Sequence, residues 1–518
     1  MSQSLIAALQ NPALYPHPVE AFQVIETHIS WVVLTGSYAY KLKKPMNFGF
    51  LDFTDLEKRG HFCREELRLN QRLTDDLYLE VLPITGTAEA PQLGGDGPVI
   101  EYALKMRQFP QSQLLSTLQA NGELTSAHID EMAKQIAHFH LTAPTVPQEH
   151  PAGTPDEVMA PVRQNFDQIR PFLSDKVDLA QLDALHAWAE SSFERLKPLF
   201  AQRKLEGFTR ECHGDIHLGN ATLIDGHVVI FDCIEFNEPF RFTDVYADTA
   251  FLAMDLEDRG LKSLARRFIS QYLELTGDYH GLEVLNFYKA YRALVRAKVS
   301  LFSMPSEASP VQRATTLRQY RNYANLAESY STIPSRFLAI THGVSAVGKS
   351  HVAMRLVEAL GAVRLRSDVE RKRLFGEQHV ENTPQAGIYA ADASAATYAR
   401  LNEIADTVLR AGYPVVLDAT FLKREQRDAA AKIAEATGAP FLILDCNAPQ
   451  AVISSWLAQR QADKNDPSDA TLTVIEEQHA NRDPLTAEEL LLSKRVETNE
   501  SGTLDALVAH IRQHLPGL

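Results

Sequence analysis

The sequence predicts a two-lobed α+β domain followed by an α/β domain with a parallel sheet, and three observations support this fold class. Strand-like runs surround one amphipathic helix in residues 21–110, and residues 126–330 show mostly helical spacing of apolar side chains. The pattern breaks at Ile333-Pro334-Ser335, and short buried-type strands then alternate with helices. We therefore predict one domain over residues 1–332 and a second over residues 336–518.

The composition is that of a globular protein and excludes several functional classes. The 518 residues are 45% hydrophobic and 23% charged, and the formal net charge of -15 argues against a general binder of nucleic-acid backbones. The four cysteines lie far apart without a CxxC pair, so the sequence predicts neither a disulfide framework nor a zinc site. It shows neither an export signal nor an apolar run of the ~20 residues that a membrane span needs, so we expect a cytoplasmic protein.

A pair of strands near the N-terminus carries two lysines on one face. Both strands are expected within residues 28–43, and alternate side chains of a strand share a face, so Lys41 and Lys43 project together. A phosphate-binding lysine of an ATP-binding lobe needs this setting; Lys41 is the first candidate and Lys43 the second, unless both are solvated edge lysines. Glu66, on the helix expected over residues 56–73, is the candidate acid that holds the lysine, or else an ordinary surface acid.

The densest group of polar residues lies in Glu211–Asn237. Asp215 and Asn220 stand with four residues between them, which is the spacing of the protein-kinase catalytic loop. About a dozen residues later, a β-branched run leads to Asp232, where a kinase places its second metal-binding aspartate. Asp225-Gly226 predicts the tight turn of a hairpin. The segment therefore predicts a phosphoryl-transfer centre.

These residue types suit phosphoryl transfer because ATP carries negative charge, which metal ions and positioning must offset. Asp215 is the candidate catalytic residue that orients or deprotonates an acceptor hydroxyl. Asn220 and Asp232 are candidate magnesium ligands, and Glu235 is a candidate ligand for a second ion or for the substrate. The alternative is a surface loop with ordinary turn acids.

Two further groups of charged residues follow this loop. Asp244 and Asp248 stand at the start of an apolar helix, where carboxylates satisfy free amide groups, so we expect both to be structural. Lys289, Arg292 and Arg296 share one face of a later helix. That face is either solvated or a binding surface for an anionic substrate.

The second domain opens on a complete phosphate-binding loop. A short strand at Phe337–Ile340 leads into GVSAVGKS, the GxxxxGK(S/T) pattern, whose glycines are Gly343 and Gly348, and a helix follows. Backbone amides of such a loop and the helix N-terminus bind phosphate oxygens. We expect Lys349 to reach the outer phosphates and Ser350 to reach magnesium.

Further candidates in the second domain follow its strands. Asp368, after the second strand, is the candidate base that contacts an acceptor hydroxyl, and Asp418, at the end of a buried strand, is a candidate magnesium-binding acid. Arg460 and Arg482 flank the polar segment Gln461–Asp469, which has the composition of a mobile lid that closes on phosphates. The alternative for both arginines is plain surface charge.

The motifs resemble known families. The stretch HGDIHLGN together with Asp232 resembles the aminoglycoside phosphotransferase superfamily, which shares the two-lobed protein-kinase-like fold, over roughly residues 20–330. The resemblance implies Asp215 as catalytic base and Asn220 and Asp232 as magnesium ligands, although the turn at Gly36 lacks a full glycine-rich loop. Residues 336–500 resemble P-loop kinases related to gluconate kinase, the zeta toxins and polynucleotide kinase, through LRSDVERKRL and VVLDATF. The order is similar to a bacterial class of tandem proteins.

These features predict an ATP- and Mg²⁺-dependent kinase with two nucleotide sites. Its expected partner is a small molecule with a hydroxyl group, which is anionic if the basic helix binds it. We expect no membrane partner, and the sequence does not indicate the oligomeric state. Two alternatives remain: the P-loop half is a regulatory nucleotide switch, or the protein phosphorylates RNA ends. Aminoglycoside resistance is the weakest option, because a polycationic drug calls for an acidic docking wall.

Overall fold

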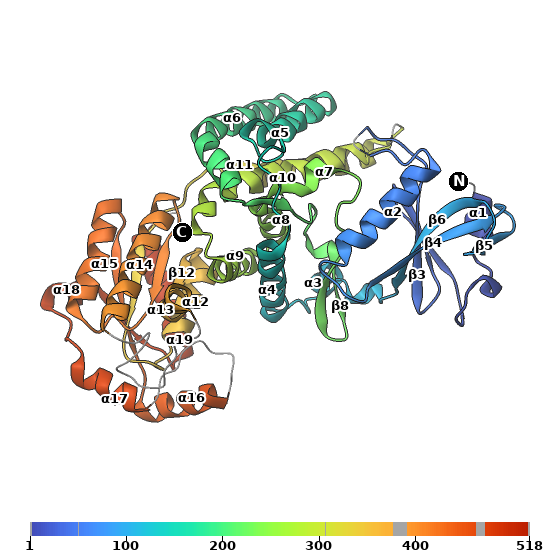
Figure 1. Cartoon of the computed structure of the whole chain (residues 1–518). Coiled ribbons are helices and arrows are strands. Elements are labelled where there is room, and N and C mark those ends of the chain that lie inside the picture. Colours follow the sequence, from blue (N-terminus) through green and yellow to red (C-terminus); the bar gives the residue numbers. More distant parts are fainter. Residues whose placement is uncertain (1–2, 50, 306, 377–390, 463–471, 516–518) are drawn as a thin grey trace. The chain divides into compact units, whose positions relative to one another are not determined.

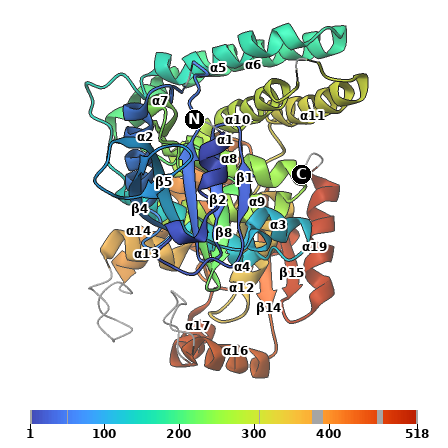
Figure 2. The same ribbon diagram turned by 90° about the vertical axis from the view of Figure 1, so that its right-hand side faces the viewer.

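The computed structural model describes residues 3–49, 51–305, 307–376, 391–462 and 472–515 (Figures 1 and 2). The chain forms two compact units. Unit 1 comprises Met1–Asp258 and Phe287–Ala324, and unit 2 comprises Arg259–Asn286 and Asn325–Leu518. Unit 2 thus includes residues 259–286, which the sequence division leaves in the first domain.

The first part of unit 1 is a six-stranded antiparallel sheet with the order β1-β2-β3-β6-β4-β5. A helix, α2, packs on β4 and β6, and its first turn is capped by the side chain of Asp55. A shorter helix, α1, buries Leu5 and Ile6 in the same core as Val33 and Leu42. The bounds are α1 Gln3–Ala8, β1 Gln23–Glu26, β2 Ser30–Leu34, β3 Tyr38–Lys43, α2 Leu56–Asn70, β4 Tyr78–Gly86, β5 Pro91–Leu93 and β6 Val99–Arg107.

The rest of unit 1 is mostly helical, as the periodicity predicts. A two-stranded sheet of β7 and β10 accompanies the helices, and Asp244 of β10 pairs with the buried Arg203 at 2.6 Å, a structural role as expected. The elements are α3 Leu115–Ala120, α4 Ser126–Thr142, α5 Pro155–Ile169, α6 Lys176–Leu205, β7 Thr209–Glu211, α7 Glu238–Arg241, β10 Phe242–Asp244, α8 Val245–Asp258, α10 Leu282–Phe302 and α11 Pro310–Ser329, the last two crossing between units.

A β-hairpin follows the central loop of unit 1. Its strands, β8 (Ala221–Ile224) and β9 (His227–Ile230), pair antiparallel across the two residues Asp225 and Gly226. Their φ angles of 52° and 82° are those of a type I′ turn, in which both central residues are left-handed. The predicted hairpin is therefore confirmed.

Unit 2 contains a five-stranded parallel sheet with the order β12-β13-β11-β14-β15, which confirms the predicted sheet type. Because β11 lies between β13 and β14, the loop after it opens at a crevice at the carboxyl ends of the strands, where ligands bind such sheets. The strands are β11 Leu338–His342, β12 Val363–Arg366, β13 Val415–Asp418, β14 Phe441–Asn447 and β15 Ser493–Glu497.

Helices cover this parallel sheet. α9 comes from the early segment of unit 2 and packs on α12 and β12, so it belongs to the same layer as the helix that follows β11 (Figure 1). The described helices are α9 Lys262–Thr276, α12 Lys349–Leu360, α13 Ser367–Phe375, α14 Ala391–Arg410, α15 Arg424–Thr437, α16 Gln450–Ala462, α17 Leu472–Asn481, α18 Ala487–Leu491 and α19 Ser501–His514. Among the described residues, we find no helix long and apolar enough to cross a bilayer.

The starts of two helices follow from local chemistry. The residue that caps α4 is Thr125, whose side chain accepts a hydrogen bond from the amide of His128. α5 begins at Pro155, within a proline-rich stretch. Proline fits the first turn of a helix because its missing amide hydrogen has no partner there anyway.

Candidate active sites

Lys41 and Lys43 lie on one face of β3 and share a single buried carboxylate. Their Nζ atoms each lie 2.7 Å from an oxygen of Glu66, a residue of α2 with no exposed surface. Lys41 also lies 2.8 Å from Oδ1 of Asp232, and Lys43 also pairs with Glu235. The alternation along the strand predicted the common face. We call these five residues the lysine–carboxylate cluster.

Burial and charge act in opposite directions within this cluster. Burial alone would raise the pKa of Glu66, but the ammonium groups of Lys41 and Lys43 outweigh it and lower that pKa to about 2. Burial dominates at Glu235 and raises its pKa, although Lys43 opposes this. Glu66 therefore stays ionised, and Glu235 is the acid that takes up a proton first as the pH falls.

We expect Glu66→Gln to weaken ATP use by unit 1 and to destabilise the protein by about 3–5 kcal/mol, the usual effect of removing one partner from buried ion pairs. Glutamine keeps the shape of Glu66 but leaves two buried ammonium groups without the carboxylate between them. Urea unfolding measures this loss. Glu65→Gln is the control, because Glu65 is partly exposed and its nearest partner, Arg68, is about half exposed. Equal losses for the two variants would contradict the prediction.

The same variant should change the acid dependence of stability. A carboxylate whose pKa is lowered on folding stabilises the fold above its ordinary pKa of 4.5, and this contribution is lost as the pH falls towards about 2. The free energy of unfolding of the Glu66→Gln protein should therefore fall less steeply across this window than that of the wild type.

Asp215 lies in the loop after β7, and its carboxylate is partly exposed. Its Oδ2 accepts a hydrogen bond from Nδ2 of Asn220 at 3.0 Å and lies 3.4 Å from Nε2 of His217. Burial would raise the pKa of Asp215, but His217, His213 and Arg292 outweigh it and lower it to about 2. The side chain is 34% exposed, so an ionised carboxylate is accessible to a hydroxyl group.

Acids of α8 hold this loop in place. The two oxygens of Asp248 accept hydrogen bonds from the amides of His213 and Gly214, both at 2.8 Å. Seven residues further along α8, Asp255 accepts a hydrogen bond from the amide of Leu218 at 3.0 Å. The expected structural role of Asp248 is confirmed. Sequence reasoning missed His217 and Asp255; an acid seven residues beyond Asp248 on an apolar helix was the available signal for Asp255.

Asp232 adopts a backbone conformation that is uncommon for a residue with a side chain. Its φ is 65°, its amide donates to the hydroxyl of Tyr78 at 3.1 Å, and its side chain is 41% exposed. Asn220 and Asp215 lie in the adjoining loop. Carboxylate and amide oxygens are ligands that Mg²⁺ prefers, so these residues fit a magnesium ion.

A cleft of about 1370 Å³ in unit 1 brings these groups together. Val32, Leu34 and Met106 line an apolar part of it, which suits a flat adenine base. Asp215 and Asp232 line the same cleft. It can therefore hold a nucleotide and a second molecule at once.

The structure does not bring the three basic residues of α10 together at this cleft. Lys289 is buried and lies 2.7 Å from Glu257, and Arg296 bonds to Tyr323. Of the three, Arg292 alone is among the residues that line the cleft. The expectation of a common docking face is corrected accordingly, because two of the side chains are engaged by neighbouring helices.

The phosphate-binding loop of unit 2 joins β11 to α12 in a conformation that requires glycine twice. Gly343 has a φ of 138°, and a Cβ atom there would lie 2.8 Å from the carbonyl oxygen of Cys446. Gly348 has a φ of 88°, and a Cβ atom there would lie 2.9 Å from Cβ of Thr498. Both glycines therefore let the loop turn tightly beside neighbouring chain.

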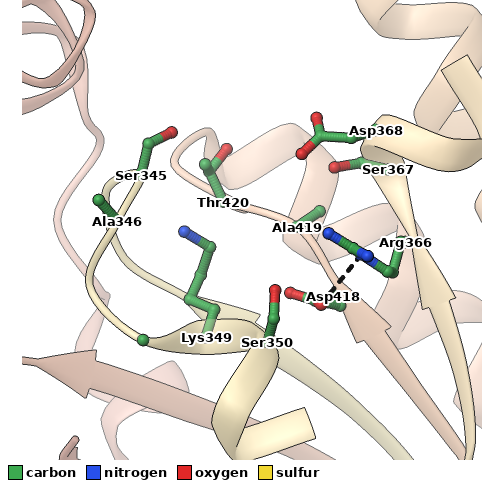
Figure 3. A pocket seen from close by; sticks show the side chains of 11 residues that line it. Ser345, Ala346, Lys349, Ser350, Arg366, Ser367, Asp368, Asp418, Ala419 and Thr420 are labelled. Carbon is green, nitrogen blue, oxygen red and sulfur yellow. Dashed lines mark ion pairs between the residues drawn. The ribbon is translucent and has the colours of Figure 1, made fainter. Parts of the chain in front are cut away.

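Polar side chains gather around this loop in one pocket. Figure 3 shows the amino group of Lys349 pointing into the pocket and the hydroxyl of Ser350 beside the carboxylate of Asp418. Oδ2 of Asp418 is buried without a hydrogen-bond partner among the described residues, so it fits a water-bridged magnesium ion. Asp368 lines the opposite side, and burial raises its pKa although Arg371 opposes this.

Arg366, to which the sequence analysis assigned no role, links this pocket to α9. Its Nε lies 3.9 Å from Oδ2 of Asp418, and its Nη1 lies 3.3 Å from Oε1 of Glu274 (Figure 3 shows the first contact). Arg364 contacts the other oxygen of Glu274 at 2.8 Å. A helix far from the P-loop in sequence thereby sets the position of a pocket residue.

The predicted lid lies largely outside the described residues, which end at 462 and resume at 472. Arg460 belongs to α16, but its side chain is outside the described part of the chain. Arg482 follows α17 and is exposed, and it is not among the described residues that line the P-loop pocket. Phosphate binding by either arginine stays a prediction.

Family models match both parts of the chain. Residues 61–285 match the phosphotransferase enzyme family, and residues 338–485 match an AAA domain family. An uncharacterized protein of Mycobacterium tuberculosis is 30% identical over 459 residues, which cover 87% of this chain and 89% of the relative. The predicted tandem of a phosphotransferase domain and a P-loop domain is thereby confirmed, and the chain belongs to the family of this mycobacterial relative.

Solved structures show more distant likeness. A choline kinase from Cryptosporidium parvum shares 13% identity with a TM-score of 0.39, covering 63% of this chain and 94% of that one. A putative kinase from Chloroflexus aurantiacus shares 18% identity with a TM-score of 0.29, covering 35% of this chain and 97% of that one.

Proposed function

Because this chain belongs to the family of its mycobacterial relative and joins a phosphotransferase domain to a P-loop domain, we propose that it is an ATP-dependent kinase with two nucleotide sites. Its acceptor is a hydroxyl group of a small molecule. One observation carries the proposal for unit 1: three members of the lysine–carboxylate cluster (Lys41, Asp232 and Glu235) and the ionised Asp215 line one cleft that is large enough for two ligands.

In unit 1 the side chains divide the work of phosphoryl transfer. Lys41 binds phosphate oxygens of ATP, and Glu66 fixes its position. Asp215 orients the acceptor hydroxyl and takes its proton as the oxygen attacks the γ-phosphorus. A new bond forms between that oxygen and phosphorus, the bond from phosphorus to the β,γ-bridging oxygen breaks, and ADP leaves. Positioning and charge supply most of the catalysis.

Magnesium would be held in unit 1 by Asn220 and Asp232. Glu235 forms an ion pair with Lys43 and so neutralises the charge of that lysine beside the ion. The ion would neutralise negative charge on the phosphates. Asp232 presents its carboxylate from a fixed left-handed backbone, so its direction is set by the chain before any ligand binds.

In unit 2 the corresponding roles fall to a different set of side chains. Backbone amides of the P-loop and Lys349 bind the phosphates, and Ser350 and Asp418 would hold magnesium. Asp368 faces the same pocket from the start of α13 and is the group that would contact an acceptor hydroxyl. The pKa of Asp368 is raised, so it lies closer to neutral pH than the pKa of an ordinary aspartate, which suits a general base.

A metabolite extract tests the proposal. Protein, ATP and magnesium are incubated with the extract, and mass spectrometry records compounds that gain the mass of one phosphate. We expect products with the wild type and none with the double variant Asp215→Asn, Lys349→Ala. If the double variant makes the same products, neither site is a kinase site.

A second candidate, a nucleotide-operated switch in unit 2, is favoured by the chain of contacts from Asp418 through Arg366 to Glu274. Glu274 belongs to α9, which lies between α8 and α10 in the sequence. Acids of α8 hold the loop that carries Asp215, and Arg292 belongs to α10. Under this alternative, unit 2 hydrolyses ATP without any acceptor. In the extract experiment the Asp215→Asn protein would then form ADP but no phosphorylated compound, and Asp368→Asn would be without effect.

A further inference from the structure

We propose that the cleft of unit 1 contains an acceptor subsite formed by Asn165, Tyr288 and Lys298. This subsite binds a polyhydroxylated small molecule that carries an acid group, either carboxylate or phosphate, remote from the reacting hydroxyl. The inference rests on the proposed phosphotransferase function of the same cleft, and it names the class of its acceptor.

Two helices supply walls of this part of the cleft. The residues of α10 that line it recur every three or four positions, the spacing of one helical face; among them are Tyr288, Arg292, Val295, Lys298 and Val299. The lining residues of α5 follow the same rule and include Pro161, Gln164, Asn165 and Gln168. A molecule between these helices therefore meets a continuous surface of both.

Two polar groups on these walls are left without partners. Asn165 is 1% exposed, and neither its amide nitrogen nor its amide oxygen has a hydrogen-bond partner among the described residues. Tyr288 is 3% exposed, and its hydroxyl is likewise unpaired within the described part of the chain. Buried polar groups are normally satisfied. Because a hydroxyl group both donates and accepts, a polyhydroxylated ligand can satisfy an amide and a phenol together.

A cationic group on the same wall lacks a counter-charge. Lys298 is half-buried, lines the cleft and forms no ion pair with any described residue. Burial lowers the pKa of Lys298 to about 8, the direction expected for an ammonium group without a nearby acid. Arg292 lies on the same face. The acids that line the cleft are the exposed Glu157 and, at the reacting end, Asp215, Asp232 and Glu235. An acidic ligand would supply the missing partner of Lys298.

The positions along α10 give the ligand a direction and a size. Arg292 and Asp215 line the same cleft, so we place the reacting hydroxyl at this level of the helix. Lys298 lies six residues further, roughly 9 Å along the helix axis. A molecule of the size of a hexose derivative spans this distance, with its reacting hydroxyl at Asp215 and its acid group at Lys298.

The test uses the full-length Lys349→Ala protein, so that only unit 1 turns over ATP. ADP formation is measured with a hexonate, a hexose phosphate, a neutral hexitol and choline as acceptors. We expect one of the acids to be preferred over the hexitol and over choline, and the choice between hexonate and hexose phosphate identifies the acid group. We expect Lys298→Gln to raise the KM for that acid on the order of tenfold to a hundredfold, with kcat nearly unchanged.

Matched variants separate charge from structure. Lys298→Arg should keep most of the affinity, and Glu157→Gln should lower the KM for the acid because it removes a like charge from the cleft. Lys134→Gln, an exposed lysine of α4, is the control without effect. Equal use of the hexitol and the acids, or an unchanged KM in Lys298→Gln, overturns the subsite while the kinase function stands. A neutral or cationic acceptor identified in the extract experiment also overturns the subsite. If no product in that experiment depends on Asp215, the proposed function of unit 1 is itself overturned.

Discussion

Asp215→Asn should reduce phosphoryl transfer by unit 1 by a factor of about 10²–10⁴, while ATP binding stays close to that of the wild type. Asparagine keeps the shape and the contact with Asn220 but cannot take a proton from the acceptor. The measurement is single-turnover phosphorylation of an acceptor in the Lys349→Ala background, which silences unit 2. Because the pKa of Asp215 is about 2, the wild-type carboxylate stays ionised at neutral and mildly acidic pH.

Asp225→Asn is the matched control for this experiment. Asp225 occupies the turn of the neighbouring hairpin, its side chain is exposed, and its φ of 52° suits asparagine as well as aspartate. The control variant should keep full activity. A fall in ATP affinity equal to the fall in turnover for Asp215→Asn would mean that the residue binds nucleotide rather than acting on the acceptor.

Lys349→Ala should strongly weaken nucleotide binding at unit 2. The ammonium group lies in the P-loop pocket, and charge-assisted hydrogen bonds to phosphate are worth ~1.5–3 kcal/mol each, so affinity falls on the order of tenfold to a hundredfold or more. Titration calorimetry with a non-hydrolysable ATP analogue should give two sites for the wild type and one for the variant.

Lys432→Ala is the control for the titration, since Lys432 is an exposed residue of α15 in the same unit. It should retain both sites. Two sites of unchanged affinity in Lys349→Ala would show that the P-loop does not bind ATP, and one site in the wild type would contradict the proposal of two nucleotide sites.

Local patterns predicted the elements that carry the motifs. The β8–β9 hairpin follows from the two turn residues between β-branched runs, and the parallel sheet of unit 2 follows from strands and helices that alternate around the P-loop. By contrast, β1 and β15 were not predicted. Both are short strands that carry no motif of their own. Each is defined by its pairing with a neighbouring strand, β1 with β2 and β15 with β14.

Long-range packing explains what sequence reasoning missed in the sites. Helical periodicity correctly put Lys289, Arg292 and Arg296 on one side of α10, but it could not show which side faces the cleft. The cleft face includes Arg292 and Lys298 but neither Lys289 nor Arg296. Glu257 and Tyr323 of other helices engage those two side chains. The contact of Glu274 with Arg366 likewise joins residues about 90 positions apart, and no local pattern reports it.

The interleaved order of the two units has a consequence for synthesis of the chain. Residues 259–286 are made before the last part of unit 1, yet they pack with residues that follow Ala324. Arg266, Ser270 and Glu274 of α9 contact Ala359 and Arg364, which come later in the chain. While the ribosome completes α10 and α11, these side chains have not yet met those partners, so unit 1 must close around an unfinished insertion. A chain that stops at residue 332 would leave them without these partners permanently.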